Sequence, residues 1–209
     1  MRILCVGAHP DDIEFGCGAS LSAFARQGAS IHLYVSSRGE VGGNAQTRQK
    51  EQERVARTLH ASLTWGGFED TKLHITRDLI EAVEVQIQRV KPDLIFTHYR
   101  MDTHQDHHSI ALAVITASRY IQNVVFFETP STIDFTPTVF MDISQDLAAK
   151  LKLLRLHRSQ VYKTNIPNRS ILEISKSTAV YRGYQYRVKY AEGFMPQRFS
   201  LDGRGARRR

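Results

Sequence analysis

Four side chains able to bind a metal ion or move a proton lie within six residues, in the stretch GAHPDDIEFGCG at positions 7–18. They are His9, Asp11, Asp12 and Glu14. Carboxylates this close together repel one another, and charged groups resist removal from water. A divalent cation would relieve both effects, so the spacing predicts a metal site.

A second group of metal-binding side chains follows in HYRMDTHQDHH, residues 98–108. It holds four of the nine histidines and two aspartates: His98, His104, His107, His108, Asp102 and Asp106. An isolated histidine is more often structural than a ligand, but a histidine-rich tract combined with an acidic turn favours a metal. Mixed imidazole and carboxylate ligands suit zinc or iron, whereas calcium and magnesium prefer oxygen alone.

These residue types indicate hydrolysis at a metal. A hydrolytic zinc site uses three protein ligands and a water whose pKa falls to about 7. A neighbouring carboxylate that is not a ligand can accept the proton of this water, and the pair Asp11 and Asp12 allows that division of roles. Serine nucleophile chemistry is disfavoured because G-x-S-x-G is absent, and a negative surrounding raises the pKa of the Cys17 thiol. GAHPDD also departs from the dinucleotide pattern G-x-G-x-x-G.

The elements that must position these residues alternate along the chain. Short apolar runs predict strands at 2–8, 30–37, 62–67, 93–98 and 123–128, with an edge strand in 129–144. Helical patterns lie between and after them, at 17–28, 47–59, 76–90, 106–121, 145–162 and 170–186. This alternation predicts an α/β fold, a Rossmann-like three-layer sandwich with a mostly parallel central sheet in a single domain. Both ligand-rich segments follow strands, so we expect them to meet at the carboxyl edge of the sheet.

Composition is that of an ordinary globular protein of 209 residues with a net charge of +7. Four of these charges come from the terminal GRGARRR, and without its arginines the charge is +3. We expect a domain at 1–200 and a basic, disordered tail at 201–209, whose role stays open between a solvated terminus and a phosphate-bearing partner. Two cysteines and the lack of a long apolar run predict a cytoplasmic protein that does not enter a membrane. Nucleic-acid binding is disfavoured because the body lacks a basic stripe with aromatic residues.

The motifs AHPDDIEFGCG and DTHQDHH together resemble the PIG-L or LmbE-like superfamily of metal-dependent N-deacetylases. Further segments are similar to family blocks in the expected order: SRGEVGGNAQTRQKE, GFEDTKL, KPDLIFTH, FETPSTIDFTPTVFMDIS, HRSQ and the closing YAEGF. The resemblance implies removal of an acetyl group from an N-acetylated amino sugar of the N-acetylglucosamine type, with Zn²⁺ as cofactor and Fe²⁺ as the alternative. It leaves open whether the chain forms a homo-oligomer.

The resemblance also implies residue roles. The zinc ligands would be His9, Asp12 and His107, the last chosen over His108 by the H-x-D-H register. Asp11 would be the general base, His104 would stabilise the oxyanion, and Asp106 would orient a ligand.

Three further positions are similar to sugar contacts of the family: Glu40, Arg48 and Asp70. Arg48 is equally open to pairing with Glu51 or Glu53 on its own helix, and Asp70 to closing a turn. His98 is expected as a supporting or core residue, and His32, His60, His74 and His157 as structural or surface residues.

Two other functions remain open from the sequence. The same metal chemistry could act on a non-sugar N-acyl substrate such as a lipid, peptide or natural-product amide. A non-catalytic sugar- or nucleotide-binding protein could keep the metal for structure, although Asp11 argues against this because a structural site has no use for an extra carboxylate.

Overall fold

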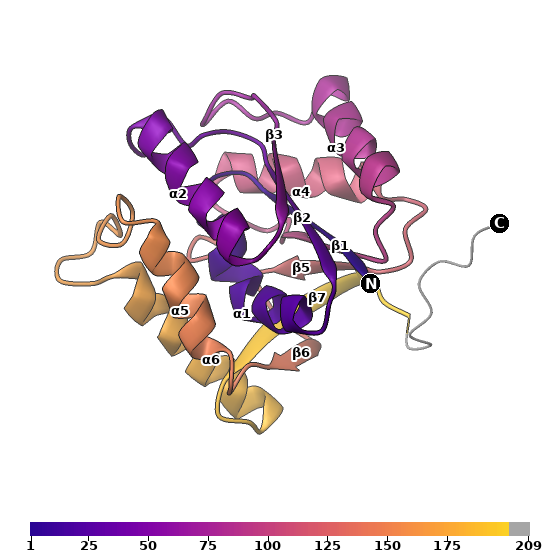
Figure 1. Ribbon diagram of the computed structural model, residues 1–209. Helices are drawn as coiled ribbons and strands as arrows, with labels where there is room; N and C mark the ends of the chain where they lie inside the picture. The colour runs from indigo at the N-terminus through magenta and orange to yellow at the C-terminus, as the bar shows by residue number, and fades with distance from the viewer. Residues whose placement is uncertain (201–209) are drawn as a thin grey trace.

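The computed structural model describes residues 1–200, in which six helices surround one seven-stranded sheet (Figure 1). The strands are β1 (Arg2–Gly7), β2 (Ser30–Val35), β3 (Ser62–Trp65), β4 (Leu94–His98), β5 (Val124–Phe127), β6 (Val139–Asp142) and β7 (Ala191–Arg198). The helices are α1 (Asp12–Arg26), α2 (Ala45–Thr58), α3 (Arg77–Val90), α4 (Gln105–Ala117), α5 (Leu147–Leu156) and α6 (Ile171–Tyr186). The predicted basic tail at 201–209 lies outside the described residues.

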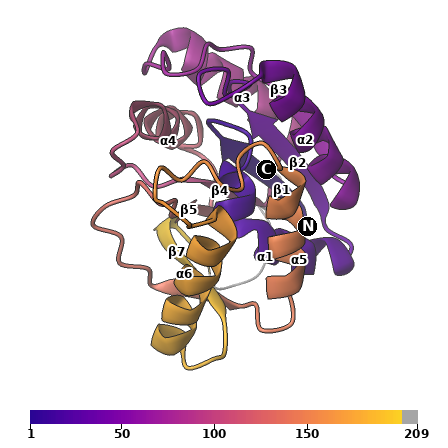
Figure 2. The ribbon, with the colours of Figure 1, turned by 90° about the vertical axis from the view of Figure 1, so that its left-hand side faces the viewer.

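The sheet has the strand order β3-β2-β1-β4-β5-β7-β6. Its first five strands are parallel, and β7 joins β5 and β6 in antiparallel pairs. The mostly parallel α/β sheet predicted from the alternating pattern is therefore confirmed. Figure 2 turns the molecule so that the loops following the parallel strands face the viewer.

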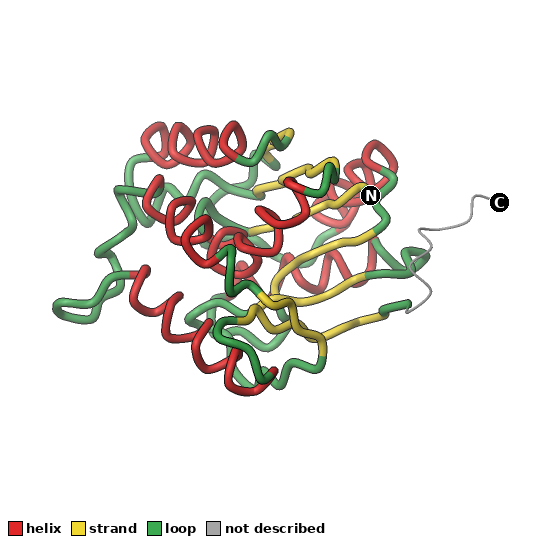
Figure 3. The backbone as a smooth tube through the Cα atoms, turned by 60° about the horizontal axis from the view of Figure 1, so that its bottom comes forward, coloured by secondary structure: helices red, strands yellow, loops and turns green. Residues whose placement is uncertain are grey.

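Helices cover both faces of the sheet, as the predicted three-layer sandwich requires (Figure 3). Successive side chains of a strand point to opposite faces. In β1, Ile3 and Cys5 pack in a core shared with α1, α2 and α5, whereas Leu4 and Val6 pack in one shared with α3 and α4. Both faces of β1 are thus apolar, which explains its continuous hydrophobic run.

Three elements differ from the sequence-based expectation, and one of them is α5, which ends at Leu156 rather than continuing to residue 162. Helix α1 begins at Asp12 rather than at Cys17, so Asp12 and Glu14 lie in its first turn. The positive end of the helix dipole favours carboxylates at this place. Strand β7 was not predicted, because AEGFMPQR lacks an apolar run and contains Pro196. In residues 1–200 no helix is long and apolar enough to span a membrane.

Candidate active site

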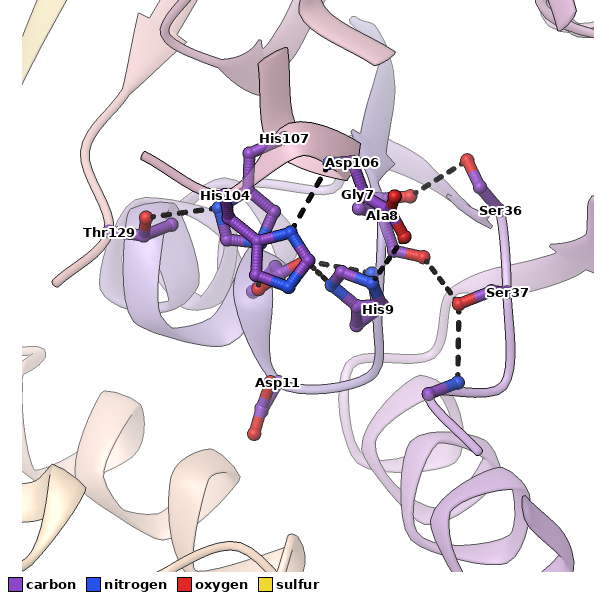
Figure 4. Close-up of polar contacts among 12 residues, drawn as sticks. Gly7, Ala8, His9, Asp11, Ser36, Ser37, His104, Asp106, His107 and Thr129 are labelled. Carbon is purple, nitrogen blue, oxygen red and sulfur yellow. Dashed lines mark hydrogen bonds and ion pairs between the residues drawn. The ribbon is translucent and has the colours of Figure 1, made fainter. Parts of the chain in front are cut away.

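The two predicted ligand segments meet at the ends of β1 and β4 (Figure 4). These strands are parallel neighbours, with Val6 opposite Thr97, so the residues after them leave the sheet at one edge. The ring centroids of His9 and His104 are 4.8 Å apart, and His104 stacks on His107 at 4.5 Å. His98 stacks on the other face of His107. We call His9, His98, His104, His107 and Asp12 the histidine cluster.

Asp12 is shared by three imidazoles. Its carboxylate lies 3.2 Å from Nε2 of His98, 3.3 Å from Nε2 of His107 and 3.4 Å from Nδ1 of His9. It also accepts a hydrogen bond of 2.7 Å from the backbone N–H of His9. Burial opposes ionisation, but His107 and His98 hold the pKa of Asp12 well below its ordinary value. The carboxylate is therefore ionised.

His9 has carboxylates on both sides of its ring. Its Nε2 is 2.9 Å from Asp70 and 3.0 Å from Asp106, while Nδ1 faces Asp12. Although burial disfavours a charged ring, Asp106, Asp12 and Asp70 raise the pKa of His9 well above its ordinary value. The negative charge of the carboxylates around His9 therefore favours a cation at this position.

His107 is oriented in the same way by Asp102, which the sequence placed in the second ligand-rich segment without assigning it a role. Its Nδ1 lies 3.3 Å from the Asp102 carboxylate, which also accepts hydrogen bonds from the Thr129 and Thr132 hydroxyls at 3.0 and 2.9 Å. Burial lowers the pKa of His107, but Asp12 and Asp102 outweigh it and raise this pKa to about 9. Carboxylates behind a ligating histidine orient its ring, and the position of Asp102 in DTHQDHH was the available signal.

His104 forms the N-cap of α4. Its Nδ1 accepts a hydrogen bond of 3.2 Å from the backbone N–H of Asp106, which assigns the ring proton of the neutral form to Nε2. Burial, together with the neighbouring His107 and His9, lowers the pKa of His104, so the ring is neutral. A half-buried neutral ring with a free Nε2–H is suited to donate to a developing negative charge.

Asp11 stands apart from the histidines (Figure 4). It has a left-handed backbone, with φ of 90°, and its side chain makes no capping hydrogen bond to α1. The charge nearest its carboxylate is the Arg48 guanidinium at 3.6 Å. Burial raises the pKa of Asp11 to about 6, against the opposing effect of Arg48. An unbonded carboxylate of this kind has the properties of a proton acceptor near neutral pH.

The three predicted sugar contacts are bound to the protein itself. Asp70 faces His9 and accepts from the backbone N–H of Val41 at 2.9 Å, and Glu40 accepts from the N–H of Asp70 at 2.8 Å. Arg48 donates to the carbonyl of Gly39 at 2.7 Å and to that of Pro10 at 2.8 Å. Arg48 therefore spans the loops beside Asp11, and the contacts of the described residues do not include the expected pairing with Glu51 or Glu53.

Three further histidines, His98, His108 and His157, lie in different surroundings. His108 is exposed, and its Nδ1 lies 2.7 Å from the carbonyl of Arg100, outside the cluster. His98 is fully buried and Nε2 accepts from the N–H of Ala8 at 3.2 Å, while burial lowers its pKa to about 4. His157, which we expected to be structural or on the surface, is buried in a 3.0 Å ion pair with Glu14.

The donor atoms of the cluster fit a metal ion. Three sets have ligand atoms within 4.8 Å of one another: His9 with His104 and His107, Asp12 with His98 and His107, and His9 with Asp70 and Asp106. The predicted ligands His9, Asp12 and His107 are divided between the first two sets. Buried imidazole nitrogens and carboxylate oxygens in this mixture suit zinc or iron.

Comparison with known proteins identifies the family. Residues 4–118 match the family PIG-L, described as GlcNAc-PI de-N-acetylase. The chain is also 36% identical over 172 residues to the uncharacterized deacetylase YaiS of Escherichia coli, covering 75% of this chain and 90% of the relative. The chain belongs to the PIG-L family.

Other similar proteins extend the comparison. The chain is 25% identical over 233 residues to the diacetylchitobiose deacetylase of Thermococcus kodakarensis, covering 93% of this chain and 83% of the relative. The conserved protein TT1542 of Thermus thermophilus shares the fold, with a TM-score of 0.84 and 24% identity over 97% of this chain and 98% of that one. A 4-oxalmesaconate hydratase of Pseudomonas putida is 23% identical over 151 residues, covering 66% of this chain and 58% of the relative. Proteins similar to this chain thus include ones named for two different reactions.

Proposed function

We propose that this PIG-L family chain is a zinc-dependent hydrolase that removes the acetyl group from an N-acetylated amino sugar of the N-acetylglucosamine type. The observation that carries the proposal is the contrast between adjacent carboxylates. Asp12 is shared by three imidazoles. Among the described residues, the side chain of Asp11 beside it has an ion pair with Arg48 but no hydrogen bond, and its pKa is about 6. One carboxylate is placed to hold a cation and the other to take a proton.

In this proposal His9, Asp12 and His107 hold the ion. Zinc bound there would supply a water molecule of lowered pKa and would polarise the acyl carbonyl; iron is the alternative ion. Asp106 orients His9 from behind, at 3.0 Å from Nε2, and Asp102 does the same for His107 at 3.3 Å.

The protein's own side chains carry the proton transfers. Asp11 accepts a proton from the water molecule that attacks the acetamide carbonyl. His104 donates its Nε2–H to the carbonyl oxygen as negative charge develops there. When the C–N bond breaks, the proton held by Asp11 passes to the nitrogen, so water and the amide become acetate and a free amine.

The sugar itself is proposed by analogy with relatives. The diacetylchitobiose deacetylase is named for a sugar substrate, and the family description names an N-acetylglucosamine lipid. Among the expected sugar contacts, Glu40 and Arg48 bind main-chain atoms, which suits holding the loops around the site. A non-sugar N-acyl substrate, with the same metal chemistry, is the alternative.

The test is acetate release from a panel of N-acetylglucosamine derivatives and non-sugar N-acetyl compounds, with zinc-loaded protein. We expect release from an amino sugar and its loss in Asp11→Ala, by about 10²–10⁴-fold, with zinc content unchanged. Asp78→Ala, at an exposed position in α3, is the matched control and should keep full activity.

Each contrary outcome has a distinct meaning. Protein that binds no divalent metal would overturn the metal mechanism. Full activity in Asp11→Ala would remove this residue as the base. Release from non-sugar amides alone would replace the sugar by the alternative substrate class.

A further inference from the structure

Helix α1 is not continuous. Cys17 has non-helical angles, with φ of −143° and ψ of 18°, and separates a first turn that begins at Asp12 from the rest of the helix. In an unbroken α-helix the N–H of Ala19 would donate to the carbonyl of Phe15. Both of these groups have other partners in the structure.

Two charged side chains from the C-terminal third of the chain fill the break. Glu192 in β7 accepts from the N–H of Ala19 at 3.1 Å, from the N–H of Ser20 at 2.8 Å and from the Ser20 hydroxyl at 2.5 Å. Lys150 in α5 donates to the carbonyl of Phe15 and to Glu192, the latter at 2.6 Å. The ion pair therefore replaces the helical hydrogen bond that the break removes.

The charges have the signs that the two helix segments require. The Glu192 carboxylate lies at the amino end of the second segment, and the Lys150 ammonium lies at the carboxyl end of the first turn. Their side chains are only 3% and 5% exposed. Burial at this level makes the loss of one partner costly, because the other charge is left unpaired.

The same break connects the ion pair to the active site. The first turn carries Asp12, and the N–H of Phe15 donates to the carbonyl of Asp11 at 2.9 Å. Gly16 packs against the Phe127 ring so closely that a Cβ would lie 2.2 Å from it. The turn is thus held on one side by β5 and at its end by Lys150.

We propose that Lys150 and Glu192 are positioning residues for Asp12. By bridging the break in α1 they set the direction of the first turn, and with it the place of the Asp12 carboxylate among the three imidazoles. This gives a role to the closing segment YAEGF, in which Glu192 is the charged residue. The inference rests on the proposed function, because it takes Asp12 as a metal ligand.

The experiment compares zinc dissociation constants of the full-length chain by competition with a chelator, well below the thermal midpoint. We expect Glu192→Gln and Lys150→Met to bind zinc about 10- to 100-fold more weakly than wild type, the range found when supporting groups of a metal site are removed. Arg26→Met is the matched control. It breaks the ion pair with Asp146 near the other end of α1, and it should lower the thermal midpoint while zinc affinity stays unchanged.

Milder variants keep the test decisive if a single charge deletion prevents folding. Ser20→Ala removes one hydrogen bond to Glu192 but keeps both charges, and we expect roughly 2- to 5-fold weaker zinc binding. The double variant K150M/E192Q leaves no unpaired charge and should fold with weakened zinc affinity.

The outcomes separate the inference from the function on which it rests. Folded Ser20→Ala and K150M/E192Q proteins with wild-type zinc affinity would overturn the positioning role and leave the pair as a purely stabilising one. A wild-type protein that binds no zinc would instead overturn the proposed function.

Discussion

The histidine cluster and the Lys150–Glu192 pair are two buried groups of charged residues that contact the same helix, and they are built differently. In the pair, the Glu192 carboxylate accepts from four donors, and the Lys150 ammonium has both a carbonyl and a carboxylate as partners. In the cluster, one carboxylate, that of Asp12, is divided among three ring nitrogens at 3.2 to 3.4 Å.

This difference separates a site from a supporting structure. Buried polar groups normally satisfy one another, as the ion pair does by binding the two backbone groups left without helical partners at the break in α1. The cluster keeps ring nitrogens and carboxylate oxygens directed at common points, with further carboxylates behind His9 and His107. Such an arrangement brings together the donor atoms that could hold a cation.

The difference between the cluster and the ion pair can be tested first at His104, where we expect a larger effect than at the supporting residues Asp102 and His157. Because Nε2–H is free to donate, removing it should lower kcat by about 10²–10³-fold. His104→Asn is the appropriate change, since asparagine can still cap α4 through its side-chain oxygen. Steady-state kinetics and zinc content are measured together. Unchanged kcat would exclude His104 as an oxyanion donor.

Asp102 gives an intermediate effect. Asp102→Asn weakens the acceptor for Nδ1 of His107, and zinc affinity should fall by about 10- to 100-fold. Asp93→Asn is the control, because this carboxylate pairs with Arg2 at the start of β1, away from the site. Chelator competition measures both variants, and equal affinities would show that Asp102 does not support the metal site.

The smallest effect concerns His157 and the pH dependence of stability. Glu14 accepts from Nε2 of His157 and also from Gln52 at 2.9 Å, whereas Nδ1 of His157 is buried without a hydrogen-bond partner among the described residues. Burial lowers the pKa of His157, but Glu14 outweighs this and raises it above the ordinary value. The stabilisation is therefore fully present below about pH 6.5, the unfolded pKa, and is lost as the pH rises through the folded pKa.

Urea unfolding of the metal-free chain measures this contribution. The free energy of unfolding of wild type minus that of His157→Gln should shrink as the pH rises above about 6.5. Taking the difference removes the titration of the other histidines, which both proteins share. A difference that is constant or grows with pH would contradict the charged pair.

The sequence predicted the ligand-rich segments and the parallel sheet because both depend on local patterns. His9 and Asp12 follow an apolar run, and His104 and His107 follow another, so the topology of parallel strands was enough to bring them to one edge. The predicted metal ligands remain a proposal. His107, the histidine chosen by the motif, faces Asp12, whereas His108 lies outside the histidine cluster. The sugar contacts suggested for Glu40 and Arg48 also stay a prediction, since both side chains bind backbone atoms and no sugar contact is tested.

Local sequence patterns could not predict the contacts that support the site from distant parts of the chain. Glu14 and His157 are 143 residues apart in sequence, and Glu192 lies 172 residues from Ser20. No periodicity or motif relates residues across such separations, because their contact depends on how α5 and β7 pack against α1. Strand β7 itself was missed for a related reason, since pairing with β5 and β6 rather than an apolar run makes it a strand.

The sequence by itself determined which chemical groups stand at the carboxyl edge of the sheet, since strand and helix patterns are set by neighbouring residues. Only the tertiary structure decided which ring nitrogen faces which carboxylate, and why Asp12 lies among imidazoles while Asp11 faces Arg48. Those orientations arise from burial and from hydrogen bonds between distant segments, and both exist only once the chain has packed.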